Sequence, residues 1–305
     1  MTDEIITFTA SIEDEDERID KVLTNYFENI SRSYVQKMIK DGNAYANDKV
    51  IKANYRLREG DIIRCCIPAC TEPEIEPEDI PLDILYEDED ILIVNKPKNM
   101  VVHPSAGHYS HTLVNGLLFH CHGQLSGING VFRPGIVHRI DKDTTGSLIV
   151  CKNETAHNCI AEQLKEHSIT RKYRAIVYGN FDQTNGTVDA PIGRDEKDRK
   201  KMAVNYKNGK NAITHYKVLK QFQGYSYVEC QLETGRTHQI RVHMTSIGHP
   251  LLGDTTYGAR SSKYHLQGQC LHAMTIGFIH PSTKQYMEFE APLPEYFLHL
   301  LDILE

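Results

Sequence analysis

An acidic segment with three prolines divides this chain of 305 residues into two unequal parts. It begins at residue 71 and reads TEPEIEPEDIPLD. Proline removes a backbone donor and restricts the residue before it, and like charges extend a chain. We therefore expect an acidic linker over residues 71–82. A small domain over 13–70, with an N-terminal tail of residues 1–12 before it, should precede the linker, and a larger domain over 83–305 should follow it.

Charge is unevenly distributed along the sequence. The formal net charge is -7, yet residues 1–17 carry seven acids and residues 71–90 carry ten, with no Lys or Arg in either stretch. The rest of the chain is therefore net basic. A basic body allows a polyanionic partner such as a nucleic acid, although acidic segments can also serve only to keep a protein in solution.

The composition indicates a globular cytoplasmic protein. Hydrophobic residues make up 40% and charged residues 25%, which is the usual mix for such proteins. No apolar run approaches the ~18–20 residues of a membrane helix, and the acidic N-terminus is unlike a signal peptide. The eight cysteines are scattered and contain no C-x-x-C pair, so neither a disulfide framework nor a zinc ribbon is expected. We expect reduced thiols, no membrane contact and, by default, a monomer.

The small N-terminal part has the pattern of a compact module with a basic face. Apolar residues recur at helical spacing over ERIDKVLTNYFENI (17–30) and SRSYVQKMIKDG (31–42), and short β-rich runs follow. Residues 31–64 hold eight basic side chains against four acidic ones. Such a face suits contact with an RNA backbone, although ordinary solvated helices can show the same pattern.

The larger part mixes strands and helices without a regular βαβ alternation, which favours an α+β fold built on a mixed, mainly antiparallel sheet. Helices are expected over 154–167 and 239–248. Strands are expected over 90–97, 147–153, 172–179, 213–219 and 225–233.

Five ionisable side chains crowd a short connection between two β-rich runs in GIVHRIDKDTTGSLIV: His138, Arg139, Asp141, Lys142 and Asp143. Functional residues are often placed on loops held by a rigid scaffold. The alternative is that one of the two aspartates merely caps a turn.

A second charged cluster surrounds the start of an expected helix in ETGRTHQIRVHMTSIGHPLLGDTTYG. Arg236 and His238 lie at its beginning, and Arg241 follows among apolar residues. A buried arginine requires a carboxylate partner, for which Asp141 is the natural candidate. A solvent-facing Arg241 is the alternative.

Common signatures of nucleotide, metal and hydrolase sites are missing. The sequence has no G-x-x-x-x-G-K-[ST], G-x-G-x-x-G, H-E-x-x-H or G-x-S-x-G. We therefore expect no cofactor and no metal.

The two charged segments resemble signature blocks of the RluA-type pseudouridine synthases. The first is similar to H-R-L-D-x-x-T-S-G, and the second to L-x-T-G-R-T-H-Q-I-R-V-H followed by G-x-P-x-x-G-D-x-x-Y-G. Three more blocks agree, NKPKNMVVHPSAG, RKYRAIVYG and LHAMTIGFIHP. The small part resembles an S4 RNA-binding domain through RIDKVL, SRSYVQKMIKDG and REGD. The resemblance spans about residues 13–300.

The resemblance implies an enzyme that isomerises specific uridines in structured RNA to pseudouridine without a cofactor or metal. The expected substrate is 23S ribosomal RNA or its large-subunit precursor, with tRNA as the alternative. The resemblance assigns Asp141 as the nucleophile, and it leaves open whether Asp141 attacks the base or the sugar. Arg241 is its ionic partner, and Tyr173 packs on the target base and helps to move the C5 proton.

The target base must leave its stack to reach the enzyme, and the resemblance places Arg139 in the vacated position. The RNA-binding residues expected in total are Arg139, His138, Arg236, Arg32, Lys37 and Lys40. A basic run over 194–210 is either a further phosphate contact or a plain solvated hairpin.

Two other functions compete with this interpretation. One is a non-catalytic S4-type RNA-binding factor for ribosome assembly, which loss of Asp141 or Arg241 would have favoured. The other is a hydrolase using His138 with Asp141 or Asp143, which would need a serine, cysteine or metal at a recognisable motif, and none is found. Asp141 and Arg241 are both present, so the synthase is preferred.

Overall fold

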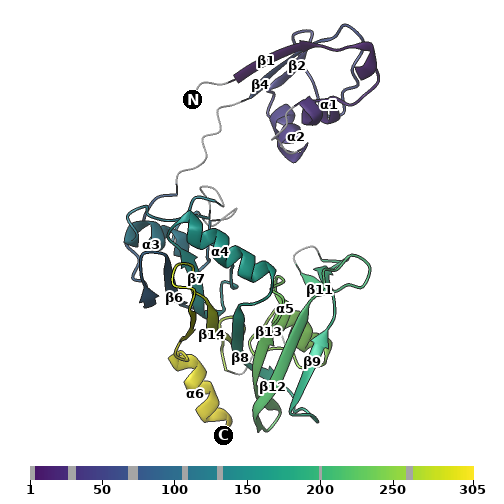
Figure 1. Cartoon of the computed structure of the whole chain (residues 1–305). Helices are drawn as coiled ribbons and strands as arrows, with labels where there is room; N and C mark the ends of the chain where they lie inside the picture. Colours follow the sequence, from purple (N-terminus) through teal and green to yellow (C-terminus); the bar gives the residue numbers. More distant parts are fainter. Residues whose placement is uncertain are drawn as a thin grey trace. The chain divides into compact units, whose positions relative to one another are not determined.

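The computed structural model describes residues 4–26, 32–67, 75–104, 109–128, 133–198, 201–258 and 264–305. The chain forms two compact units, Met1–Pro73 and Glu74–Glu305 (Figure 1). None of the helices in these described ranges is long and apolar enough to cross a membrane.

The small unit is a four-stranded antiparallel sheet covered by two helices. The strands follow the order β1 (Glu4–Thr9), β4 (Ile62–Ile67), β2 (Ala44–Ala46), β3 (Lys49–Val50). The short 3-10 helix η1 (Ile12–Asp14) precedes α1 (Ile19–Tyr26) and α2 (Arg32–Lys40), which confirm the two expected helices. The apolar positions of both helices and of β4 form one core that includes Ile19, Leu23, Val35, Ile39 and Ile63.

Residues 4–9 are not the N-terminal tail that the sequence suggested. They form β1, whose register pairs Glu4 with Ile67 and Thr9 with Ile62. Phe8 packs against the core of the small unit. The acidic composition of residues 1–17 hid this strand, because its pairing with β4 depends on backbone groups and not on charge.

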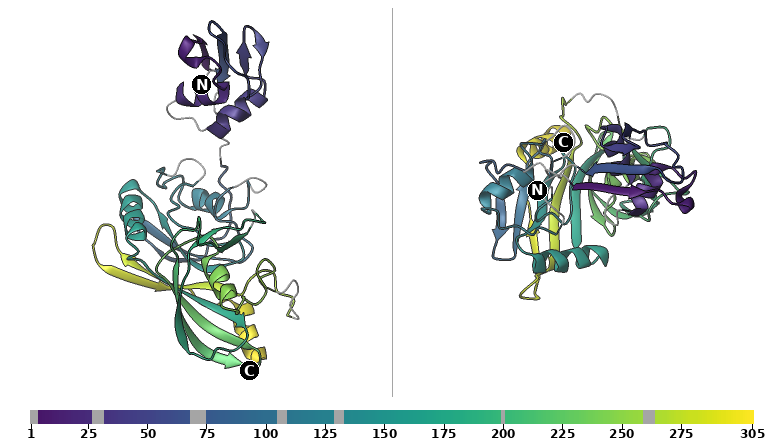
Figure 2. Two further views of the ribbon diagram at one scale, coloured as in Figure 1. Left: turned by 90° about the vertical axis from the view of Figure 1, so that its right-hand side faces the viewer. Right: turned by 90° about the horizontal axis from the view of Figure 1, so that it is seen from above.

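The larger unit is built on a nine-stranded mixed sheet (Figure 2). The pairing of β7 with β14 is parallel and the other pairs in this sheet are antiparallel, which confirms the expected fold class. In spatial order the strands are β5 (Ile84–Glu87), β6 (Ile91–Lys96), β7 (Thr145–Cys151), β14 (Leu271–Ile279), β8 (Thr170–Tyr178), β13 (Tyr225–Leu232), β12 (Ile213–Phe222) and β9 (Asn185–Asp189), with β15 (Tyr286–Glu290) paired to β14.

The central strands are buried on both faces. Along β6, Leu92 packs into one core together with α3 (Leu113–His120), while Ile91 and Ile93 pack into a second core under α4 (Glu154–Lys165). Two covered faces explain why β6 and β7 read as continuous apolar runs and not as alternating ones. The hairpin of β10 (Ile192–Arg194) and β11 (Met202–Val204) and the helices α5 (Gln239–Ser246) and α6 (Glu295–Leu304) complete the unit.

Part of the acidic segment over 71–82 is not a free linker. Within the described part, residues 75–82, Ile75 and Leu82 pack against the core of the larger unit. The backbone N–H of Glu78 donates to a carbonyl of α3 at 3.0 Å. The expected linker is therefore wrong from residue 75 onward, because its apolar side chains find a surface to cover. The part before residue 75 lies outside the described residues.

Candidate active site

The loop that carries Asp141 lies next to the parallel pair of strands in the sheet. It leads directly into β7, which lies against β14. Gly146 has a φ of 108°, and a Cβ added there would collide with the carbonyl of Ala273. Glycine thus permits the close approach that fixes the end of this loop.

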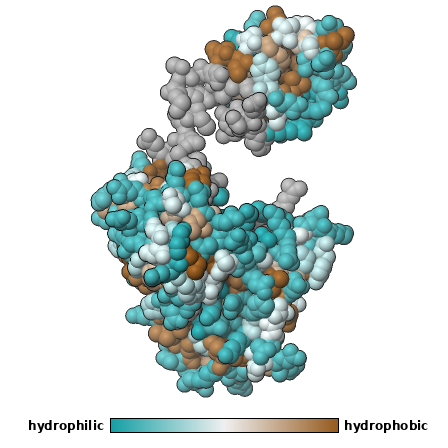
Figure 3. Space-filling view, in the orientation of Figure 1, coloured by the Kyte–Doolittle hydropathy of each residue, from teal (hydrophilic) through white to brown (hydrophobic). Residues whose placement is uncertain are grey.

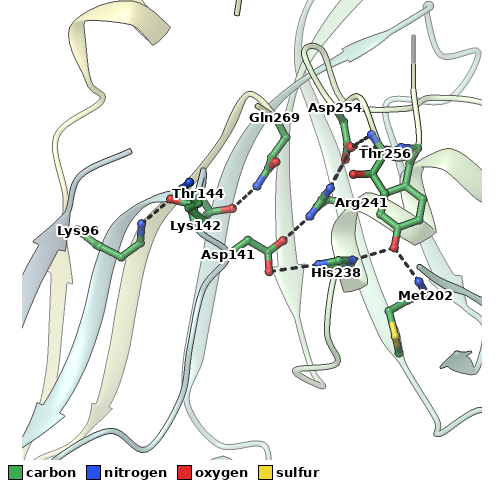
Figure 4. A network of polar contacts seen from close by, with 11 residues as sticks. Lys96, Asp141, Lys142, Thr144, Met202, His238, Arg241, Asp254, Thr256 and Gln269 are labelled. Carbon is green, nitrogen blue, oxygen red and sulfur yellow. Dashed lines mark hydrogen bonds and ion pairs between the residues drawn. The ribbon is translucent and has the colours of Figure 1, made fainter. Parts of the chain in front are cut away.

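Lys96 fastens the same loop from the other side. Its side chain is fully buried, and its Nζ donates to the carbonyl oxygens of Pro97 at 2.8 Å and Met100 at 2.9 Å. It also donates to the carbonyl oxygen of Lys142 at 3.0 Å (Figure 4). The three N–H groups of an ammonium match these three acceptors. Burial lowers the pKa of Lys96 to about 7, with Asp143 and Asp141 opposing the shift. Lys96 therefore joins the end of β6 to the Asp141 loop.

Asp141 and Arg241 lie in direct contact. Arg241 Nη1 donates to Asp141 Oδ2 at 2.8 Å, and the Asp141 side chain is 20% exposed. Arg241 is buried on α5 among apolar residues. The structure thus brings together the two residues that the sequence paired, and the solvent-facing alternative for Arg241 is wrong.

A second carboxylate, that of Asp254, also accepts hydrogen bonds from Arg241. Arg241 Nε donates to Asp254 Oδ2 at 2.6 Å and Nη2 donates to Asp254 Oδ1 at 3.0 Å. Burial alone would lower the pKa of Arg241, but the contacts with Asp254 and Asp141 outweigh it and hold that pKa above its ordinary value. Sequence reasoning missed Asp254. The available signal was the aspartate of the GDTTYG block.

His238 approaches Asp141 from the start of α5. Its Nε2 lies 3.8 Å from Asp141 Oδ1, and its Nδ1 lies 2.8 Å from Tyr257 Oη. Tyr257 Oη also accepts the backbone N–H of Met202, at 2.9 Å, so its own hydroxyl proton is available to Nδ1. The remaining proton of a neutral imidazole is then on Nε2, which faces Asp141 (Figure 4). Burial, with Arg241 and Arg139, lowers the pKa of His238 against the opposing effect of Asp141 and Asp254.

Two cavities meet at Asp141. The first has a volume of about 550 Å³ and is lined by Tyr173, Leu232 and Leu271. The second has a volume of about 640 Å³ and is lined by His103 and by residues of the 254–256 loop. Both volumes fall in the range of ligand sites. Both cavities share the following residues: Arg139, Ile140, Asp141, His238 and Arg241.

Tyr173 places a neutral phenol in the first cavity. It lies on β8 and is almost fully buried. Burial raises the pKa of Tyr173, Asp141 adds to this shift and Arg171 opposes it. Among the described residues its hydroxyl has no hydrogen-bond partner, so both the ring and the hydroxyl are available to a ligand.

The expected RNA-binding residues around Asp141 differ in their surroundings. Arg139 is exposed and lines both cavities. Arg236 is half-buried, lines the first cavity and donates from Nε to the carbonyl of Asn211 at 2.9 Å. His138 Nε2 accepts the backbone N–H of Ile149 at 2.9 Å, and burial, with Arg171, lowers the pKa of His138 to about 3. This contact favours a role in shaping the loop.

In the small unit, Arg32 has a structural contact that the sequence did not reveal. Its guanidinium is half-exposed and donates to the buried carboxylate of Asp20 from Nε at 3.2 Å and from Nη2 at 3.1 Å. Lys40 is exposed. The side chain of Lys37 lies outside the described residues. In Figure 3 the surface of the larger unit that faces the viewer is mostly hydrophilic, whereas that of the small unit mixes hydrophilic and hydrophobic residues.

Two known protein families match this chain. The RNA pseudouridylate synthase family matches residues 90–246, and the S4 domain family matches residues 17–63. The chain therefore belongs to the RluA-type RNA pseudouridine synthases that carry an N-terminal S4 domain. It is an isomerase.

Relatives match most of the length of this chain. It is 54% identical to the uncharacterized RNA pseudouridine synthase YlyB of Bacillus subtilis (strain 168), covering 98% of each chain. It is 46% identical to the ribosomal large subunit pseudouridine synthase D of Zymomonas mobilis, covering 91% of this chain and 90% of that one. The solved structure of human RNA pseudouridylate synthase domain containing 1 matches with a TM-score of 0.58 at 28% identity, covering 71% of this chain and 85% of that chain.

Proposed function

We propose that this enzyme isomerises specific uridines of large-subunit ribosomal RNA to pseudouridine, with Asp141 as its nucleophile. The observation that carries the proposal is the contact of Asp141 with Arg241 at 2.8 Å, at the place where two cavities meet. A charged, oriented and partly exposed carboxylate in a cavity is what covalent catalysis by an aspartate requires.

The reaction breaks the bond between N1 of uracil and C1′ of ribose. The base then rotates, C5 bonds to C1′, a proton leaves C5 and N1 gains one, so that substrate and product are isomers. Attack by Asp141 on the sugar at C1′ or on the base at C6 would both place its carboxylate beside the glycosidic bond. Expulsion of Asp141 in a later step restores the enzyme.

Arg241 supports this reaction by holding the Asp141 carboxylate in place through their hydrogen bond. A carboxylate that is covered by a bound base loses water, and a buried cation compensates for that loss. Asp254 fixes the guanidinium through two hydrogen bonds, so Nη1 remains directed at Asp141. His238 Nε2 faces the other carboxylate oxygen at 3.8 Å.

Tyr173 and Arg139 act on the base and on the RNA. The buried ring of Tyr173 would pack on the target uracil, and its neutral hydroxyl would assist the transfer of the C5 proton. Arg139 is exposed beside Asp141, and its planar guanidinium would fill the position that the base leaves.

The choice of ribosomal RNA rests on the relatives and on the S4 unit. Proteins named ribosomal large subunit pseudouridine synthase D from Zymomonas mobilis and Pseudomonas aeruginosa are 46% and 44% identical to this chain. The small unit supplies an RNA-binding domain.

Mapping of pseudouridines in total RNA from cells with and without this gene tests the proposal. We expect specific uridines of large-subunit rRNA to lose the modification, to regain it with the wild-type gene and to remain unmodified with Asp141→Asn. Loss confined to tRNA would contradict the proposed substrate. Restoration by Asp141→Asn would contradict the proposed nucleophile.

A further inference from the structure

Two buried arginines line the first cavity, and they differ in their partners. Arg241 is 6% exposed and contacts two carboxylates. Arg171 is 7% exposed, lines the same cavity, and has no carboxylate partner among the residues that the structure describes. The cavity therefore holds one compensated and one uncompensated buried cation.

The guanidinium of Arg171 is only partly used by the protein. Nη2 donates to the backbone carbonyl of Glu233 at 3.0 Å. Nε is buried without an acceptor in the described part of the chain. Nη1 lies against Gly235, where an added Cβ would be 2.6 Å from it, and no described residue accepts its hydrogen bonds.

In the described part of the chain, no acidic side chain compensates the charge of Arg171. A guanidinium cannot shed its proton in a protein, and a buried unpaired charge is costly. Burial lowers the pKa of Arg171, and Tyr173 is the neighbour that opposes this shift. The lining of the same cavity includes three further basic groups, Lys165, His167 and Arg236, of which Lys165 pairs with Glu162 at 3.0 Å. The buried, unpaired guanidinium of Arg171 therefore favours an anion in this cavity.

We propose that Arg171 binds a phosphate of the RNA strand immediately beside the target uridine. The phosphodiester is the anionic group of RNA, and a guanidinium fork matches its oxygens. Arg171 and Tyr173 are two residues apart on β8, on the same face and roughly 7 Å from each other along the strand. A uracil on Tyr173 would place an adjacent phosphate within reach of Arg171. The inference rests on RNA pseudouridine synthesis and adds the site that fixes the path of the strand.

A neutralised phosphate tests this site directly. The substrate is a synthetic stem–loop that contains the uridine assigned by the mapping experiment and that the wild-type enzyme modifies. Single methylphosphonates replace the phosphates on either side of that uridine, one in each RNA. We expect one replacement to lower the wild-type kcat/KM by roughly 10- to 100-fold, as for loss of a charge-assisted hydrogen bond.

On RNA with all its phosphates intact, Arg171→Met should lower kcat/KM by the same factor. On the RNA in which that one phosphate is neutral, the kcat/KM of Arg171→Met should fall no further, within about twofold. Gly235→Ala is an independent second variant, because its Cβ would displace the guanidinium without removing it. It should reproduce the pattern even if Arg171→Met does not fold. The matched control is Arg174→Met. Arg174 lies on the other face of β8 and pairs with Glu229, so this variant should keep the full wild-type sensitivity to each methylphosphonate.

The proposal would be overturned if wild type, Arg171→Met and Gly235→Ala were equally sensitive to every methylphosphonate. Arg171 would then have only a structural role, as the hydrogen-bond donor to the carbonyl of Glu233. Insensitivity of wild type to all replacements would overturn it as well. Failure of the proposed rRNA substrate is a separate result, because it shows in the mapping before these RNAs are made.

Discussion

Arg241 joins Asp141 to Asp254, with one guanidinium nitrogen on the first carboxylate at 2.8 Å and two on the second at 2.6 and 3.0 Å. The second carboxylate is almost fully buried and also accepts the backbone N–H groups of Thr256 and Tyr257. Asp254 therefore has three hydrogen-bonding partners, Arg241, Thr256 and Tyr257, and it determines the direction of the Arg241 guanidinium.

Loss of Asp254 should impair both stability and catalysis. Asp254→Asn leaves the buried Arg241 short of a counter-charge, and we expect about 3 kcal/mol of destabilisation together with a large fall in kcat. Urea unfolding and tritium release from 5-tritiated uridine in RNA measure the two effects. Asp182→Asn, at an exposed site without an ion pair in the described part of the chain, is the control. An unchanged urea midpoint would show that the ion pair contributes nothing.

The hydroxyl of Tyr257 should affect rate more than affinity. Tyr257→Phe removes the partner of His238 Nδ1 and of the Met202 N–H, so the proton of His238 is no longer held on the nitrogen that faces Asp141. We expect kcat to fall by roughly 10-fold, about 1.4 kcal/mol, with KM unchanged. Tyr286→Phe, on β15, should leave both parameters unchanged. A rise in KM alone would point to RNA contact instead.

Asp20 should make the small unit sensitive to acid. Burial would raise its pKa, but hydrogen bonds from Arg18, Gln36 and Arg32 outweigh burial and lower the pKa of Asp20 to about 2. Because the folded pKa lies below the unfolded value near ~3.9, the stabilisation is complete above that value and is lost as the pH falls through about 2.

The expected contribution of ionised Asp20 is about 2 kcal/mol. The urea midpoint of amide NMR signals from α1, recorded in the full chain between pH 5 and pH 2, measures it. Asp20→Asn should lower the midpoint at pH 5 and flatten its pH dependence, whereas Asp41→Asn, at an exposed site, should change neither. The same steep pH dependence in Asp20→Asn would refute the assignment.

Residues 75–82 should belong functionally to the larger unit. A chain that starts at Ile75 should modify a short RNA, whereas a chain that starts at Asp83 should be less stable by about 2 kcal/mol, because Ile75 and Leu82 no longer cover the core. Both should bind long rRNA more weakly than the full chain, with a shallower slope of log K against log salt. An unchanged slope would show that the S4 unit contacts no phosphates.

The elements with strong local patterns could be predicted from the sequence. The strands β6, β7, β8, β12 and β13 and the helices α4 and α5 lie where the apolar patterns indicated them. β1 was missed, because its partner strand is more than fifty residues away in sequence and its neighbourhood is acidic. The parallel pairing of β7 with β14 has no local signal either.

The candidate site could be predicted where a charged residue lies within an apolar stretch of sequence. Arg241 within an apolar helix required a carboxylate, and the crowded loop supplied Asp141. Lys96 and Tyr257 were missed, because a lysine at the end of a strand and a tyrosine in a loop usually face solvent. Their roles follow from contacts with distant backbone groups, which no local pattern encodes.

The measurement that tests the central claim most directly is tritium release by Asp141→Asn from RNA that contains 5-tritiated uridine. The amide is nearly isosteric with the carboxylate and can still accept a hydrogen bond from Arg241, so the fold should survive, as a urea midpoint near that of wild type would show. Without a charged nucleophile we expect the rate to fall by at least about a thousandfold, roughly 4 kcal/mol in the barrier. Residual turnover within about tenfold of wild type, roughly 1.4 kcal/mol, would contradict the assignment of Asp141 as the essential group.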